Sequence, residues 1–230
     1  MTLPKLDIPT FTLTLPSTNQ KVKYRPFLVK EYKTLLTTME SDTEEILRIV
    51  TDLVDVCTFN TLDVASLANF DIEYLFLNIR AKSIGEITKL NMPCKNCNTN
   101  IDFEIDLTKI QIEKNDNHDK MIKISEAIGL EMRYPRFDEM VNIYQNFNSD
   151  NIVSILSECI TTVYTKDEAY SEFTKDEMEE FVGQFSKEQF DKIEEFFLTM
   201  PKVVQRVENS CTNCGTANNV NLEGLQNFFV

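Results

Sequence analysis

The sequence predicts an α+β fold in which an N-terminal β-hairpin and helices precede a split zinc-ribbon-like β unit with a long, mainly helical insertion. Three observations predict it: an alternating apolar pattern near the start, several stretches of helical periodicity, and two Cys-x-x-Cys pairs far apart in the chain. We expect three regions: an N-terminal region over 1–85, a β-rich split zinc-ribbon region over 86–136 and 202–230, and a helical insertion over 137–201.

The N-terminal region is expected to hold one hairpin and three helices. Apolar residues alternate from Phe11 to Leu15 and again at Val22 and Tyr24, around a polar tip, as in a β-hairpin. Helical spacing follows over 28–40, 41–57 and 71–85. Ser41 or Asp42 would cap the second helix, and Gly85 would end the third.

The two Cys-x-x-Cys pairs are Cys94 with Cys97 and Cys211 with Cys214. Each pair follows a stretch that favours a strand, lies in a polar turn and precedes a second alternating run. Two such knuckles facing each other supply four thiolates in a tetrahedron, which is how a zinc ribbon is built. The sequence therefore predicts one structural Zn²⁺ with these four cysteines as ligands.

The two pairs are separated by 113 residues between Cys97 and Cys211, far more than in an ordinary ribbon. Such an insertion is tolerable because the entropy cost of closing a loop grows only with the logarithm of its length. Zinc ligation contributes on the order of 10 kcal/mol in small metal-dependent domains, which exceeds that cost. The metal would thus hold the two ends of a folded insertion together.

Other roles for the cysteines are less favoured. A redox Cys-x-x-Cys normally opens a helix, and neither pair precedes helical periodicity. Disulfides are not expected in a chain without a secretion signal, and a catalytic zinc needs a coordination position that four thiolates would close. Cys57 and Cys159 fall on apolar faces of predicted helices and are expected to be small buried hydrophobic residues.

The segment between the knuckles changes from strands to helices. Strands are expected within 110–125 and 128–135, with His118 in a solvated loop. Helices are expected over 137–147, 151–164, 174–185 and 186–200, the last two with capping boxes at Thr174/Glu177 and Ser186/Gln189. Phe196 lies beside the apolar stripe of the last helix and is a candidate partner contact.

The composition of the chain limits the classes of function that it could have. A formal net charge of −14 disfavours nucleic-acid binding and favours a protein partner, although acidity also serves solubility. No apolar run could span a bilayer, and the first residues lack the pattern of a signal peptide, so we expect the chain to stay in the compartment where it is made. Phosphate-binding glycine motifs are absent and the single histidine is a poor base, so we expect no enzyme.

Two stretches carry a resemblance to a known family. Residues Leu15 to Lys33 and Phe70 to Glu86 resemble signature stretches of the baseplate hub proteins, including hub assembly proteins, of T-even-like contractile-tailed bacteriophages. The family also shows a cysteine pair soon after the second stretch. The resemblance implies a non-catalytic role as a hub component or as an assembly factor (chaperone), with other hub and tail proteins as partners. It also implies the host cytoplasm as the site of assembly, or a place in the virion tail baseplate.

A basic strand lies within the first of these stretches. By alternation, Lys21, Lys23 and Arg25 would share one face and Tyr24 would lie on the other. In an acidic chain these four residues are candidate contacts for an acidic partner surface. The alternative is an edge strand whose lysines prevent aggregation.

Two classes of function remain open from the sequence. The first is a structural or chaperoning protein of the phage baseplate hub, scaffolded by zinc. The alternative is a zinc-ribbon adaptor that binds host transcription or translation machinery. Co-purification with hub proteins, or with polymerase or ribosome, would separate them.

Overall fold

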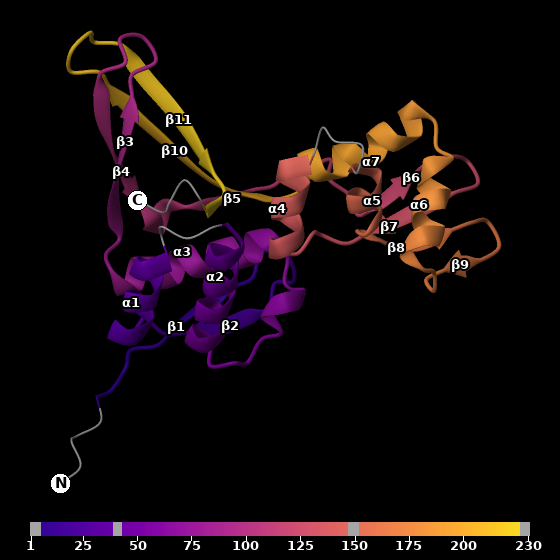
Figure 1. The fold of residues 1–230 in the computed structure, drawn as a ribbon, viewed down its shortest axis with the longest axis horizontal. Helices are drawn as coiled ribbons and strands as arrows, with labels where there is room; N and C mark the ends of the chain where they lie inside the picture. Colours follow the sequence, from indigo (N-terminus) through magenta and orange to yellow (C-terminus); the bar gives the residue numbers. More distant parts are fainter. Residues whose placement is uncertain (1–5, 39–42, 147–151, 226–230) are drawn as a thin grey trace. The chain divides into compact units, whose positions relative to one another are not determined.

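The computed structural model describes residues 6–38, 43–146 and 152–225, and in it the chain forms two compact units (Figure 1). The first unit comprises the chain up to Glu113 together with the segment from Lys202 onward, and the second unit is Lys114–Pro201. Both contain helices and antiparallel strands, so the α+β class is confirmed. Within the described ranges, no helix combines the length and apolar character needed to cross a membrane.

The first unit contains three α-helices, two short 3₁₀ helices and seven strands among the described residues. In chain order these elements are β1 (Phe11–Thr14), β2 (Lys21–Tyr24), α1 (Val29–Thr38), α2 (Thr43–Cys57), η1 (Val64–Ser66), α3 (Asn69–Ser83), β3 (Ile87–Pro93), β4 (Asn100–Asp106), η2 (Leu107–Lys109), β5 (Gln111–Glu113), β10 (Lys202–Ser210) and β11 (Ala217–Glu223). The expected hairpin and three helices are confirmed. The expected cap at Ser41 or Asp42 lies outside the described residues.

Helix α3 is the central helix of the first unit. It is apolar along most of its length and is buried on nearly all sides, so it forms the core rather than an amphipathic surface helix. Its buried Asp71 accepts hydrogen bonds from the backbone N–H of Ser17, at 3.0 Å, and from the Ser17 hydroxyl. These bonds tie the β1–β2 hairpin to the helix. Gly85 follows with φ of +144°, a conformation that glycine adopts readily.

Two long antiparallel hairpins carry the cysteine pairs. Strand β3 pairs with β4, and β10 pairs with β11 on one side and with β5 on the other. Side chains alternate along β4, so that Ile101, Phe103 and Ile105 are buried. Asn209 Nδ2 donates to the carbonyl of Asp102 at 2.7 Å, which joins β10 to β4. Figure 1 shows the turns of both hairpins at the same end of this pair of ribbons.

Among its described residues, the second unit has a four-stranded antiparallel sheet and four helices. Its elements are β6 (Met121–Lys123), β7 (Gly129–Met132), α4 (Phe137–Asn146), α5 (Ile152–Ser157), β8 (Ile160–Tyr164), β9 (Ala169–Tyr170), α6 (Lys175–Gly183) and α7 (Lys187–Thr199). The sheet order is β6-β7-β8-β9. The capping boxes at Thr174/Glu177 and Ser186/Gln189 are confirmed.

The structure corrects one expected helix. The helix expected over 151–164 ends at Ser157, and β8 begins at Ile160. The segment Ile160–Val163 is β-branched throughout and pairs with β7, which overrides the helical spacing of its apolar residues.

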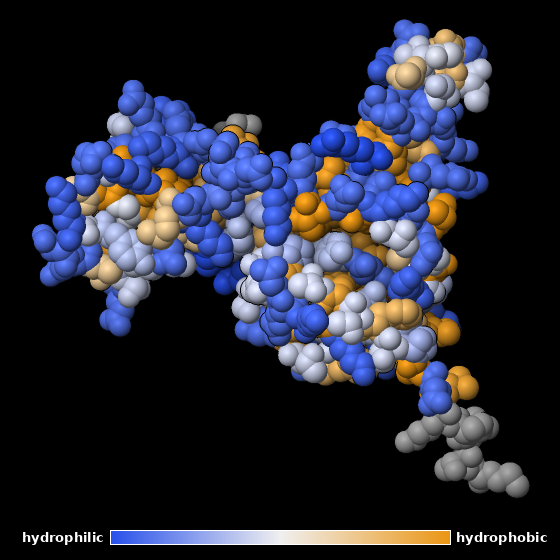
Figure 2. All heavy atoms as spheres, turned by 180° about the vertical axis from the view of Figure 1, so that it is seen from behind, coloured by the Kyte–Doolittle hydropathy of each residue, from blue (hydrophilic) through white to orange (hydrophobic). Residues whose placement is uncertain are grey.

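The expected region 86–136 is divided between the units. Strand β5 lies in the first unit, whereas β6 and β7 lie in the second, together with the helices of the expected insertion. On the face drawn in Figure 2, most of the surface of each unit is hydrophilic, and hydrophobic residues show in smaller patches.

Candidate metal centre

The two cysteine turns have the same backbone geometry. In the first, the N–H of Cys94 donates to the carbonyl of Thr99 at 2.8 Å, and the N–H of Asn98 donates to the carbonyl of Cys94 at 3.0 Å. In the second, the corresponding bonds are Cys211 to Thr216 at 2.9 Å and Gly215 to Cys211 at 2.9 Å. Asn98 and Gly215 both have positive φ, 56° and 71°, which asparagine and glycine tolerate best. Each turn thereby aims both of its thiols to one side.

The four sequence-predicted thiols converge at the tips of the hairpins. All four sulfur atoms lie within 4.8 Å of one another. The closest contacts cross between the turns, 3.8 Å from Cys94 Sγ to Cys214 Sγ and 3.6 Å from Cys97 Sγ to Cys211 Sγ. Tetrahedral Zn–S bonds of about 2.3 Å require sulfur atoms roughly 3.8 Å apart. The donor set and its spacing therefore fit a metal ion bound by four thiolates.

A threonine after each pair contacts the second thiol of its turn. Thr99 Oγ1 lies 3.3 Å from Cys97 Sγ, and Thr216 Oγ1 lies 3.2 Å from Cys214 Sγ. The hydrogen bond with Thr99 lowers the pKa of Cys97, and the one with Thr216 lowers the pKa of Cys214 to about 5. Both shifts favour the thiolate, the form that binds metal.

Asn218 on β11 connects the two turns from inside the site. Its side-chain oxygen accepts from the Lys95 N–H at 3.0 Å, and its amide nitrogen donates to Cys94 Sγ at 3.5 Å and to the carbonyl of Thr216 at 2.8 Å. The side chain is buried, so these bonds are shielded from water. Sequence reasoning missed Asn218 because nothing local marks it.

The threonines could have been found from the sequence. Both turns follow the pattern Cys-x-Asn-Cys-x-Thr, in which the asparagines are Asn96 and Asn213. The threonine and asparagine that recur at the same positions of both turns indicate that these residues belong to the site. The Asn213 amide donates to Cys97 Sγ, in the opposite turn, at 3.7 Å, so each turn supplies polar contacts to the other.

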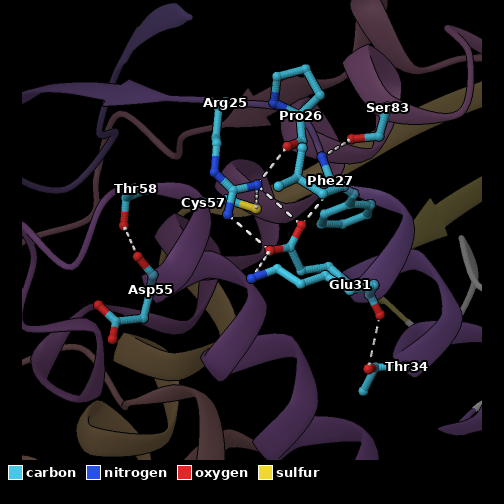
Figure 3. Close-up of polar contacts among 11 residues, drawn as sticks. Arg25, Pro26, Phe27, Glu31, Thr34, Asp55, Cys57, Thr58 and Ser83 are labelled. Atoms are coloured by element: carbon cyan, nitrogen blue, oxygen red, sulfur yellow. Dashed lines mark hydrogen bonds and ion pairs between the residues drawn. The ribbon is translucent and has the colours of Figure 1, made fainter. Parts of the chain in front are cut away.

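The candidate partner-contact residues are in two different environments. Lys21 and Lys23 are exposed on β2, whereas Tyr24 and Arg25 are buried. The expectation that Arg25 shares an exposed face with the lysines is wrong, because the chain leaves the strand after Tyr24 and turns inward. In Figure 3 the Arg25 guanidinium points at the Glu31 carboxylate, with Nη2–Oε1 and Nη1–Oε2 distances of 2.9 and 3.1 Å.

Phe196 is also buried, so it is not a surface contact in this structure. Its ring packs against His118 and Tyr134, with centroids 4.9 and 5.8 Å away. His118 is half-buried rather than solvated, because its ring stacks on Tyr134, packs at a tilt against Phe196, and has its Nδ1 3.0 Å from Thr199 Oγ1. Burial lowers the pKa of this histidine. The two lone cysteines, Cys57 and Cys159, are buried as expected.

Four converging thiols at the tips of two hairpins define a protein with a candidate metal centre. The chain belongs to the family of T4 bacteriophage base plate proteins, whose family model matches residues 8–230. It is similar to the baseplate hub assembly protein gp26 of Enterobacteria phage T4, with 26% identity over 210 residues, which cover 90% of this chain and 92% of the relative. The resemblance seen in the sequence is confirmed. No solved structure matches the chain.

Proposed function

We propose that this chain acts in building the central hub of a phage tail baseplate, as an assembly factor (chaperone) or as a hub component. One observation carries the proposal: the similarity to a hub assembly protein extends over nearly the whole of both chains. A shared length of this kind supports a shared role more strongly than a match confined to one motif. Its partners would be other hub and tail proteins in the host cytoplasm.

Zinc is the ion that best suits the centre. Four thiolates in a tetrahedron are the donor set of structural zinc sites, and such a site is closed to water and substrate. The ion would fix the tip of the β3–β4 hairpin to the tip of the β10–β11 hairpin. In this role zinc is a scaffold and the protein is not an enzyme.

Genetic complementation tests the assembly role. A phage lacking this gene should fail to form hubs, and supplying the chain in trans should restore infectious tails. Mass spectrometry of purified virions then separates the two forms of the proposal, because a component remains in the virion and an assembly factor does not. Normal hubs without the chain, or its co-purification with host polymerase or ribosome instead of hub proteins, would refute the assembly role.

The exposed lysines of β2 are proposed contacts within this role. Reversing the charge of Lys21 and Lys23 should reduce complementation without lowering the melting temperature, because both side chains are exposed. Complementation at the wild-type level would instead support the alternative, in which the lysines protect a strand edge from aggregation.

A further inference from the structure

The two halves of the chain repeat one structural arrangement. Each begins with a pair of consecutive antiparallel strands, β1–β2 or β6–β7, and an arginine directly follows the second strand. The backbone N–H of Arg25 donates to the carbonyl of Cys57 at 3.0 Å, and that of Arg133 donates to the carbonyl of Cys159 at 2.8 Å. Each half later continues from a helix into a hairpin with a Cys-x-x-Cys turn, α3 into β3–β4 and α7 into β10–β11.

The arginines also make equivalent ion pairs. Each guanidinium binds a glutamate six positions later with two hydrogen bonds, at 2.9 and 3.1 Å for Arg25–Glu31 and at 2.7 and 2.8 Å for Arg133–Glu139. Each glutamate lies in the first turn of the next helix, where its carboxylate accepts the backbone N–H three positions before it. This equivalence aligns α1 with α4 position by position, and both helices are ten residues long.

The aligned helices differ in one face. On α4, Phe137 and Met140 are only 7% and 5% exposed, and Met140 belongs to the hydrophobic core of the second unit. Their counterparts on α1, Val29 and Tyr32, are 73% and 36% exposed. Leu36, one turn further along α1, is 47% exposed. These three α1 side chains share one helical face by their spacing of three and four residues. At the two positions where both helices are described, the first unit thus leaves exposed what is covered in the second.

The exposed charged side chains of α1 itself are opposite in sign to the net charge of the chain. They are Lys30 and Lys33, and the one carboxylate of this helix, Glu31, is buried against Arg25. The whole chain has 37 acidic and 23 basic residues. A partner that covers the face is therefore favoured if it carries carboxylates around its apolar residues, whereas a basic partner is disfavoured.

We propose that the exposed face of α1, formed by Val29, Tyr32 and Leu36 with Lys30 and Lys33 beside them, is a docking surface for an acidic, amphipathic segment of a partner protein. The apolar residues of that segment would cover Val29 and Tyr32 of α1, as the surrounding residues of the second unit cover Phe137 and Met140 of α4. The inference rests on the proposed assembly function, which implies that the partner is a baseplate protein. It adds the contact surface on this chain and the chemistry of the partner segment, which the proposed function does not specify.

Site-specific photo-crosslinking in infected cells tests the proposal. A photoreactive benzoylphenylalanine replaces Tyr32 in a chain that complements the gene-deficient phage, and a matched chain carries it at Leu198, which is 62% exposed on α7. We expect a crosslink from position 32, absent from position 198, to one segment of a baseplate protein. Sequencing of that crosslinked peptide should show apolar residues at helical spacing with flanking aspartates or glutamates.

Charge reversal separates docking from chance proximity. The double variant Lys30→Glu/Lys33→Glu should reduce the yield of the crosslink at least about tenfold, because four units of charge change beside an acidic segment. The variant Lys89→Glu/Lys166→Glu makes the same change in net charge elsewhere and should leave the yield unchanged. Because Lys30 Nζ lies 3.6 Å from Glu31 Oε1, the single variant Lys33→Glu, which keeps that ion pair, is the stability control. It should also lower the yield, and its melting temperature should stay within a few degrees of the parent because Lys33 is exposed.

Three results would overturn the proposal: no crosslink above that of position 198, a crosslink to a second copy of this chain, or a crosslink to a basic segment, to nucleic acid or to lipid. The failure of the docking surface and of the assembly function are distinguishable. Complementation by the chain without a crosslink refutes the surface alone, whereas failure of the unmodified chain to complement refutes the function.

Discussion

Replacing Glu31 by glutamine should destabilise the first unit far more than the matched change of Glu139 destabilises the second. The Arg25 and Glu31 side chains are only 8% and 7% exposed. Glutamine keeps the size of Glu31 but leaves the buried guanidinium without its counter-charge. Breaking a buried ion pair in this way costs about 3 to 5 kcal/mol of unfolding free energy.

The second unit gives a matched comparison. The Arg133 side chain is 32% exposed, and Arg136, the other partner of Glu139, is 43% exposed. Water can therefore replace part of the lost interaction, and Glu139→Gln should cost about 1 to 2 kcal/mol. A double variant, Arg25→Met/Glu31→Leu, should recover most of the loss of Glu31→Gln because it removes both buried charges together.

Hydrogen exchange followed by mass spectrometry measures these effects unit by unit. Peptides from β2 and α3 report on the first unit, and peptides from α4 and α7 report on the second. In Glu31→Gln, protection should fall by a factor of about 100 or more in the first set, with little change in the second. Equal losses from Glu31→Gln and Glu139→Gln, or a double variant less stable than Glu31→Gln, would refute the buried-charge explanation.

Three further predictions concern the metal, the buried Glu73 and the half-buried His118. Cys94→Ser should reduce bound zinc from one ion per chain to nearly none, as measured by elemental analysis of the native protein. The control variant Cys57→Ala should retain the ion. Wild-type protein that contains no metal and has four reactive thiols would refute the site. Burial raises the pKa of Glu73 to about 8, above 4.5 for the free side chain, so this group favours the fold at low pH and opposes it as the pH rises from 4.5 to 8. Glu73→Gln should remove that loss of melting temperature, and an unchanged pH profile would contradict it. Burial instead lowers the pKa of His118 below 6.5, with Asp119 and Lys120 as its charged neighbours, so the second unit should lose stability as the pH falls below about 6.5. In His118→Phe, hydrogen exchange of α7 peptides should no longer respond to that pH change, and a persistent response would assign it to another group.

The sequence predicted what depends on local pattern. The hairpin at Phe11–Tyr24, the capping boxes and the four cysteines each have a signal within a few residues, and all lie where expected. It did not predict β8, because the apolar pattern of a segment such as 152–163 is compatible with a buried strand as well as with a buried helix. The pairing with β7 that decides between them is a tertiary contact.

Exposure was the other property that local pattern could not supply. Alternation placed Arg25 with Lys21 and Lys23, but the glutamate that draws it inward lies six residues away in a helix. Phe196 lies beside a predicted core stripe, and only the positions of His118 and Tyr134 show that it too is covered. The second ion pair, Arg133–Glu139, has the same spacing as the first, but a single arginine and glutamate are too common to mark a repeat in the sequence.

The repeated arrangement also explains an asymmetry in the candidate metal centre. In each turn the first cysteine, Cys94 or Cys211, is buried and the second, Cys97 or Cys214, is more exposed. Cys97 and Cys214 are therefore the two candidate ligands that a chelator in solution would reach first. Their threonine hydrogen bonds lower the pKa of both thiols, which disfavours the protonation that releases a metal. In the metal-free protein the two more exposed thiols are thus also the ones that a threonine hydrogen bond favours as thiolates.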